Sequence, residues 1–167
     1  AQVIGQVKRL SASGFNEAVL TGIHIGAYGV DMDPVSSLEQ LLVALKQKTD
    51  VHRLRLGSIE PTELPERLLS LVGTSDTVCP HLHIPLQSGD NGVLERMNRH
   101  YRTDDFYRMI MQAVELVPDV AIGLDVITGF PGESDGAFAN TYRLIESLPV
   151  SYLHVFPFRK RAGAQAD

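Results

Sequence analysis

Residues suited to chemistry gather where the chain leaves short apolar segments, and the segment GFPGE at 129–133 is the most informative. Gly129 and Gly132 have no side chain, so the backbone there can approach a ligand closely. Phe130 offers an apolar surface, and Glu133 stands near the start of the next expected helix. Helix starts bind anions well, but a carboxylate in that place repels phosphate. Backbone amides beside an aromatic ring favour an adenine-like group instead.

Four further segments follow other apolar runs in the same way. They are Thr21–Gly22, Ser58–Pro61, Pro85–Gly89 and Phe156–Arg161. Each one also reads as an ordinary turn, since glycine and proline are common in turns. Five such segments with polar groups are harder to explain as turns alone. Parallel strands place their carboxyl ends at one edge, where ligands bind, so we expect one shared ligand site.

Histidine and cysteine do not form a complete metal-binding pattern in the sequence. His81 and His83 lie on one face of an expected strand, but no third ligand accompanies them. Cys79 is the single cysteine, so the chain can form neither an internal disulfide nor a cysteine-held cluster. We therefore expect no metal site and a reducing, cytoplasmic location.

Apolar segments alternate with amphipathic ones almost from end to end, which indicates an α/β chain. The expected strands are 17–24, 52–58, 81–86, 120–128 and 152–156. The expected helices are 2–13, 37–48, 64–72, 91–97, 103–117 and 134–148, with Gly14 ending the first and Thr103 capping the fifth. A helix between successive strands requires parallel pairing, because parallel strands need a long crossover.

The two faces of the expected strands differ in polarity, and this difference selects between two parallel architectures. His81, His83 and Gln87 share one face of a strand, while the opposite face is apolar. An open doubly wound sheet is covered by helices on both faces and should be apolar on both. The pattern favours a (β/α) barrel with a ligand in its interior. Arg55 and Asp125 either line that interior or pair with each other or with other interior groups, since buried charges need partners.

Size and composition set further bounds. The 167 residues suffice for one domain with a sizeable core, and 44% hydrophobic with 21% charged residues is ordinary for a globular domain. The net charge of -5 argues against a generally basic nucleic-acid surface. No apolar stretch reaches the length of a membrane span, and no signal peptide opens the chain.

Six segments together resemble the methylthiotransferases of the radical S-adenosylmethionine (SAM) superfamily. They are LTGIHIGAYG (20–29), RLGSIEP (55–61), HLHIPLQSG (81–89), MNRHY (97–101), DVITGFPGE (125–133) and HVFPFRKRAGA (154–164), in the order and spacing of that family. The resemblance covers essentially the whole chain. SIEP and HVFPF are most similar to the branch acting on N6-threonylcarbamoyladenosine 37 of tRNA. QSG and the tyrosine of MNRHY also suit the isopentenyladenosine branch, rather than the branch acting on a ribosomal protein.

This resemblance implies a partial (β/α) barrel of the radical SAM type. Residues 1–167 would be a fragment of the catalytic domain, without the first strand and the CxxxCxxC cluster loop. The N-terminal methylthiotransferase domain and the C-terminal tRNA-binding domain would be absent too. The family uses SAM and two [4Fe-4S] clusters to insert sulfur and a methyl group at C2 of the tRNA adenosine. The parent enzyme is expected to act on tRNA in the cytoplasm, and the fragment alone to be inactive.

The resemblance also assigns site residues, none of them catalytic within the fragment. Cofactor-binding positions are Thr21, Gly22, Ser58, Glu60, Gln87, Ser88, Asp125, Gly129, Phe130 and Gly132, and substrate-binding positions are Arg55, Arg99, Arg159 and Arg161. The last two arginines belong to an RKR run that departs from the usual family residues. Contact with tRNA phosphate and a solvated charge cluster both remain open there. The missing first strand leaves an exposed sheet edge at 17–24, which predicts a homodimer.

Three other functions compete with this interpretation. The first is another radical SAM enzyme with the same barrel. The second is an aldolase-like barrel that binds a sugar phosphate at GFPGE, but the expected strands contain no lysine. The third is an RNA-binding module, which net acidity and the lack of an aromatic stacking platform disfavour.

Overall fold

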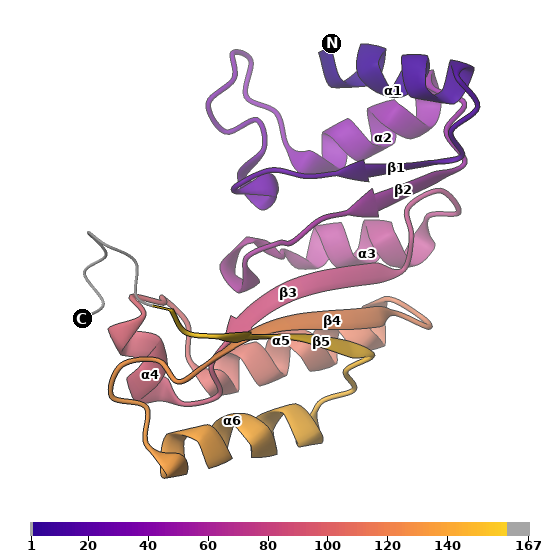
Figure 1. The fold of residues 1–167 in the computed structure, drawn as a ribbon. Helices are drawn as coiled ribbons and strands as arrows, with labels where there is room; N and C mark the ends of the chain where they lie inside the picture. The colour runs from indigo at the N-terminus through magenta and orange to yellow at the C-terminus, as the bar shows by residue number, and fades with distance from the viewer. Residues whose placement is uncertain (1, 160–167) are drawn as a thin grey trace.

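The computed structural model describes residues 2–159, in which five strands alternate with helices (Figure 1). The strands are β1 (Glu17–Leu20), β2 (Arg53–Leu56), β3 (His81–Gln87), β4 (Ala121–Thr128) and β5 (Tyr152–Pro157). The helices are α1 (Gln2–Ala12), α2 (Leu38–Lys48), α3 (Glu66–Thr74), α4 (Asn91–Arg96), α5 (Thr103–Leu116) and α6 (Asp135–Ser147), with short 3-10 turns η1 (Ile25–Ala27) and η2 (Pro61–Glu63).

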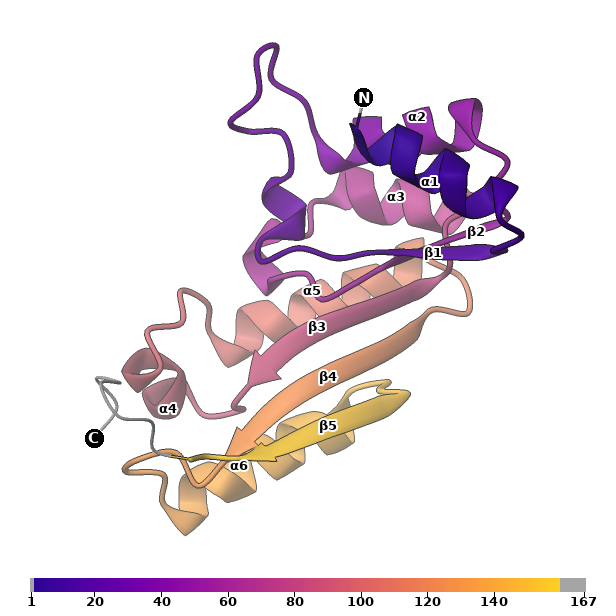
Figure 2. The same ribbon diagram turned by 45° about the horizontal axis from the view of Figure 1, so that its top comes forward.

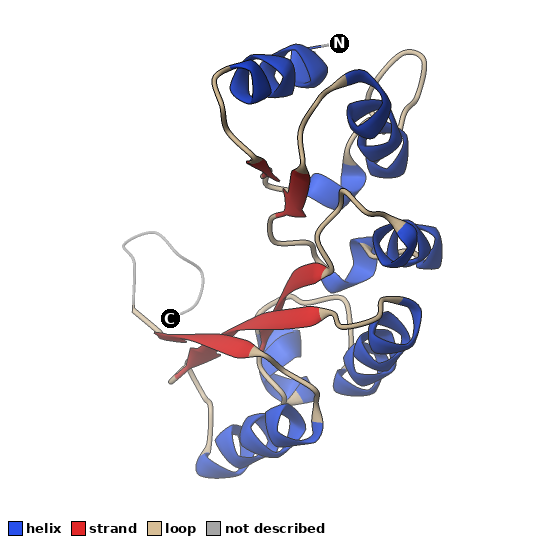
Figure 3. Ribbon diagram, turned by 90° about the vertical axis from the view of Figure 1, so that its right-hand side faces the viewer, coloured by secondary structure: helices blue, strands red, loops and turns tan. Residues whose placement is uncertain are grey.

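All strand pairs are parallel, as expected for helical crossovers. The strands pair in the orders β1-β2 and β3-β4-β5. Parallel bridges from Leu54 to Val78 and from Ser58 to His83 join β2 to the segment around β3, so the two sheets continue one another. The helices of residues 2–159 lie on the convex side of this curved sheet, and none of them covers its concave face (Figures 2 and 3). The prediction of a partial parallel barrel is confirmed.

The core lies between the convex face of the sheet and the helices. Alternate strand residues such as Leu54, Leu82, Ile84 and Leu124 are fully buried there. They meet the apolar faces of the helices, which contribute Leu42, Leu45, Leu69, Phe106 and Ile110, among others. Burial of apolar area stabilises this layer at roughly 25 cal/mol per Å². The concave face carries the polar strand side chains together with a few exposed apolar ones such as Phe156, which is close to the division that strand alternation predicts.

Several expected element boundaries differ from the structure, and two of these differences have a clear structural cause. The first strand ends at Leu20 rather than His24, because the chain turns into η1, where Gly26 packs closely against Glu63. Helix α5 takes Thr103 as its first helical residue, and Arg102 occupies the capping position. The Asp105 carboxylate accepts a hydrogen bond from the Arg102 amide at 3.3 Å, which satisfies a donor at the helix start. Within residues 2–159, no helix has both the length and the apolar character that crossing a bilayer requires.

Candidate functional site

The inner, concave face of the sheet collects polar side chains from all five strands. Glu17, Arg53 and Arg55 form its first group. The Arg53 Nε donates to Glu17 at 2.8 Å, and the Arg55 Nε donates to the other carboxylate oxygen at 2.8 Å. The two guanidinium groups lower the pKa of Glu17 to about 2, because both hydrogen-bond its charged form. Arg55 therefore has an interior partner, and that partner is not Asp125.

Tyr152 of β5 forms the middle of this face. Its hydroxyl lies 2.8 Å from His81 Nε2 and 3.1 Å from His83 Nδ1, so it links two histidines of β3. Gly123 of β4 makes this possible, because any Cβ there would overlap the Tyr152 ring. Burial raises the pKa of Tyr152 and lowers the pKa of His81, so both groups are held neutral.

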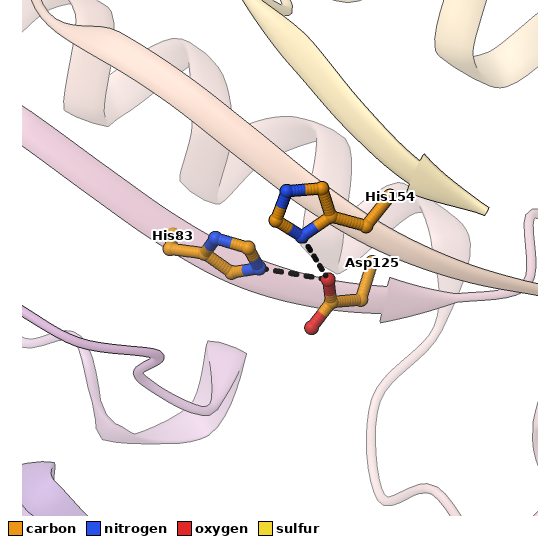
Figure 4. A group of neighbouring side chains, drawn as sticks. All are labelled: His83, Asp125 and His154. Atoms are coloured by element: carbon orange, nitrogen blue, oxygen red, sulfur yellow. Dashed lines mark hydrogen bonds and ion pairs between the residues drawn. The ribbon is translucent and has the colours of Figure 1, made fainter. Parts of the chain in front are cut away.

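A third group lies beside Tyr152 and is shown in Figure 4. Asp125 Oδ1 lies 2.9 Å from His83 Nε2 and 3.2 Å from His154 Nδ1. The three residues come from β4, β3 and β5, and their rings and carboxylate converge on one point (Figure 4). His154 and Tyr152 were not among the residues singled out from the sequence. Alternation along β5 was the available signal, since it places residues 152, 154 and 156 on one face.

Glu60 and Arg99 meet near the carboxyl end of β2. The Arg99 Nη1 donates to both carboxylate oxygens of Glu60, at 3.2 and 3.1 Å. Both side chains are nearly three-quarters buried, so the pair is partly shielded from water. The sequence assigned Glu60 to the cofactor and Arg99 to the substrate or its positioning. The structure brings the two together, and Arg99 is placed to orient Glu60.

The end of β3 is irregular, and this irregularity sets the position of Gln87. The register with β4 shifts between Pro85 and Gln87, and Gln87 has a φ of +64°. Such a bulge redirects a side chain at the end of a strand. Ser88 turns the other way: it is fully buried, and its hydroxyl lies 3.2 Å from Thr141 Oγ1 in α6. Its side chain therefore serves helix packing and does not line the inner face.

The GFPGE turn follows β4, and there is open space beside its first glycine. Gly129 has a φ of +73°, and within residues 2–159 no atom other than those of its chain neighbours lies within 4 Å of the place where a Cβ would stand. Its amide donates to the Glu133 carboxylate at 2.5 Å, while the other carboxylate oxygen is buried without a hydrogen-bond partner among residues 2–159. Phe130 is 9% exposed and packs edge-on against Phe158, with ring centroids 5.2 Å apart. The backbone at Gly129, more than the Phe130 ring, is accessible to a ligand.

The remaining site residues predicted from the sequence follow the carboxyl ends of the strands. Thr21 and Gly22 follow β1 and are exposed, and Ser58 is exposed after β2. The Gly132 carbonyl accepts a hydrogen bond from Arg96 at 3.0 Å. Arg159 is exposed after β5, and Arg161 lies outside the described residues.

Comparison with known proteins places this geometry in a family. The model of the radical SAM superfamily matches residues 1–145. The chain belongs to the radical SAM superfamily. Two solved structures have a similar fold. One is the radical SAM enzyme coproporphyrinogen III oxidase of Escherichia coli (TM-score 0.61, 18% identity, covering 73% of this chain and 28% of that one). The other is Elp3 of Methanocaldococcus infernus (TM-score 0.58, 15% identity, covering 97% and 42%). At these identities the two structures show a shared fold alone.

Curated relatives are closer in sequence. The chain is 41% identical over 166 residues to the threonylcarbamoyladenosine tRNA methylthiotransferase MtaB of Bacillus subtilis, covering 99% of this chain and 37% of the relative. It is 34% identical over 164 residues to the tRNA-2-methylthio-N(6)-dimethylallyladenosine synthase of Thermoanaerobacter pseudethanolicus, covering 98% and 35%. The chain thus spans a little over a third of the length of these relatives.

The radical SAM superfamily implies two bound groups, SAM and an iron–sulfur cluster. The residues of this chain suit the first group but not the second. Such clusters are held by several cysteine thiolates. The chain has only Cys79, which is 4% exposed, and burial raises the pKa of its thiol. These residues therefore do not supply a cluster site. The positive-φ turn at Gly129, with free space before it, does fit an adenine-bearing cofactor that approaches the backbone.

Proposed function

We propose that this chain forms the SAM-holding barrel of an enzyme that inserts sulfur and a methyl group at C2 of N6-threonylcarbamoyladenosine 37 in tRNA. The identity of 41% over 166 residues to the Bacillus subtilis MtaB carries this proposal. Relatives of the same name from Rickettsia prowazekii and Aquifex aeolicus are 37% and 38% identical. The runner-up is methylthiolation of dimethylallyladenosine, which the 34% identity to the Thermoanaerobacter synthase supports.

The chain's own residues would bind and orient the cofactor. SAM, when bound, supplies the transferred methyl group. The Gly129 turn offers backbone and free space to its adenine, and Gln87 stands on a bulge at the same edge. The Arg99 guanidinium holds the Glu60 carboxylate in one orientation, so Glu60 can accept hydrogen bonds from a ribose or amino group without moving.

The chain alone is expected to leave SAM intact. A single buried thiol cannot hold a cluster, and without one no electron reaches SAM. Treatment of the purified chain with iron, sulfide and reductant should give no 5′-deoxyadenosine by chromatography. Release of that product in proportion to protein would contradict the expectation. Residual SAM affinity is expected to be weak.

The proposed parent enzyme is cytoplasmic and has tRNA as its partner. Arg159 is exposed at the end of the described chain and suits a phosphate contact, and Arg161 is assigned to the same role from the sequence. Arg55 is committed to Glu17, so a direct role on substrate would require that ion pair to open.

Substrate choice is tested with a chimera in which this chain replaces the matching segment of Bacillus subtilis MtaB. The purified chimera is offered tRNA carrying threonylcarbamoyladenosine or dimethylallyladenosine, and methylthiolated nucleosides are measured by mass spectrometry. We expect product from the first tRNA. A matched chimera in the Thermoanaerobacter synthase is the control, because it separates the contribution of this chain from that of its host. Product from the second tRNA in both hosts would establish the runner-up.

A further inference from the structure

We propose that His83, Asp125 and His154 form a binding site for a divalent transition-metal ion, with Zn²⁺ as the reference ion. This site goes beyond the proposed function, which assigns no metal to these side chains. The sequence predicted no metal site, because it supplied two histidines on one strand and no third ligand. Of those two histidines only His83 is a ligand, and Asp125 and His154 come from the neighbouring strands β4 and β5, which only the folded sheet brings together (Figure 4).

The distances suit a common ion. One donor atom from each side chain lies within 4.8 Å of the other two. Asp125 Oδ1 is 2.9 Å from His83 Nε2 and 3.2 Å from His154 Nδ1. Two ligands bound tetrahedrally to one Zn²⁺ at about 2.0–2.1 Å lie about 3.3 Å apart. The three donors can therefore surround one ion with small side-chain adjustments.

The backbone fixes this arrangement. Asp125 and His154 are direct partners in the β4–β5 register, and His83 pairs with Gly123, two residues before Asp125 on the same face. All three side chains thus project from adjacent parallel strands onto the inner face. Sites built on strands are held more accurately than sites on loops.

The surrounding contacts match those of metal-bound histidines. A ligating imidazole almost always engages a polar group through its second nitrogen, which fixes its tautomer and ring orientation. His83 Nδ1 has this partner in the Tyr152 hydroxyl at 3.1 Å. Its Nε2 lies close to Asp125 but is buried and has no partner in hydrogen-bond geometry among the described residues. A cation between nitrogen and carboxylate would satisfy that buried atom.

Charge and access are also compatible with a cation. Arg53 and Arg55, the two arginines of the first group on this face, share the Glu17 carboxylate as their ion-pair partner. Histidine together with carboxylate suits Zn²⁺ and related ions better than Mg²⁺ or Ca²⁺, which prefer oxygen ligands. The His154 side chain is 53% exposed, so one side of the site is open. Three protein ligands with an open position characterise catalytic zinc sites, so the ion would be free to polarise water or a substrate oxygen.

The test is metal titration of the tag-free full chain. Cobalt(II) is followed by its visible absorption, and Zn²⁺ is then added in competition. We expect one equivalent to bind, and His83→Ala, Asp125→Asn and His154→Ala each to weaken binding by more than about 100-fold. Tyr152→Phe removes only the outer contact and should weaken binding by about 10-fold. His52→Ala, at an exposed histidine, and Cys79→Ser are matched controls that should leave the affinity unchanged.

Several outcomes would overturn the site. They are no saturable binding, binding that survives all three ligand substitutions, and binding lost only with Cys79→Ser. In each case the three side chains form a hydrogen-bonded group only. Asp125→Asn is nearly isosteric and His154 is half exposed, so these two variants should keep the circular dichroism of the parent chain. The readout needs neither SAM nor tRNA, so its failure would leave the methylthiotransferase proposal standing.

Discussion

Tyr101 explains how the chain tolerates a proline and a bulge in a central strand. Pro85 cannot donate to the sheet, and the bulge at Gln87 disturbs the neighbouring carbonyls. The buried Tyr101 hydroxyl lies 3.1 Å from the Pro85 carbonyl oxygen and 3.0 Å from that of Leu86, and it can donate to either one. Its burial raises the pKa of the phenol well above the usual range, so it stays a donor.

Tyr101→Phe should therefore destabilise the chain by about 1–2 kcal/mol, because it removes the buried hydrogen bond that the hydroxyl donates to these carbonyls. Urea unfolding followed by circular dichroism measures the change. Tyr107→Phe, on the exposed side of α5, is the matched control and should leave the midpoint unchanged. Equal midpoints for the Tyr101→Phe variant and the parent chain would show that the hydrogen bonds contribute nothing.

At the scale of elements, Glu17 ties β1 to β2 through Arg53 and Arg55. Its folded pKa of about 2 lies below the unfolded value of 4.5. The stabilisation is therefore fully present above about pH 4.5 and is lost as the pH falls toward 2. Glu17→Gln should therefore make the free energy of unfolding less dependent on pH in that window. The parent advantage, up to about 1 kcal/mol for a partly exposed pair, should shrink in high salt. Parallel pH profiles of the free energy of unfolding for parent and variant would contradict this account.

Two helix glycines should change the stability of the chain in opposite directions when replaced by alanine, because only one of them is closely packed. A Cβ at Gly73 in α3 would overlap the Leu116 carbonyl oxygen at the end of α5, whereas Gly5 in α1 has only the Arg9 guanidinium near, at 3.7 Å. Gly73→Ala should destabilise by about 1–3 kcal/mol through overpacking. Gly5→Ala should stabilise by about 0.5–1 kcal/mol through helix propensity. Thermal unfolding of both variants measures the contrast, and a shift of the same sign in both would refute it.

Periodicity was enough to predict the five strands, six helices and the polar inner face, because alternation and helical spacing are local properties. It could not predict which inner residues meet. Arg55 pairs with Glu17 and Asp125 with two histidines, and these choices depend on strand register and on Gly123 leaving room for Tyr152. Ser88 faces α6 for a similar reason, since the bulge before it reverses the direction that alternation assigns.

At the scale of the whole molecule, both edge strands of the sheet are open to further pairing. β1 and β5 each pair with one neighbour among the described strands. The sequence predicted pairing at β1, but β5 is the more apolar edge: Leu153 and Val155 are 39% and 56% exposed beside a groove of about 350 Å³ against α6. Unpaired edges of this kind promote association.

We expect concentration-dependent self-association of the chain in sedimentation velocity. Val155→Lys should reduce it, because a lysine on an edge strand opposes pairing. Val19→Lys makes the matched change on β1. If the chain dimerises through β1 instead, this variant will reduce self-association and Val155→Lys will not. A monomer at all concentrations would remove both edges as interfaces.

The most direct test of the central claim is whether this barrel can work inside a methylthiotransferase. Cells lacking Bacillus subtilis MtaB would receive the chimera, and their tRNA nucleosides would be measured by mass spectrometry. We expect 2-methylthio-N6-threonylcarbamoyladenosine to return, and Gly129→Val in the chimera to abolish it by filling the space before the turn. A soluble, cluster-loaded chimera that leaves the unmodified nucleoside in place would contradict the account.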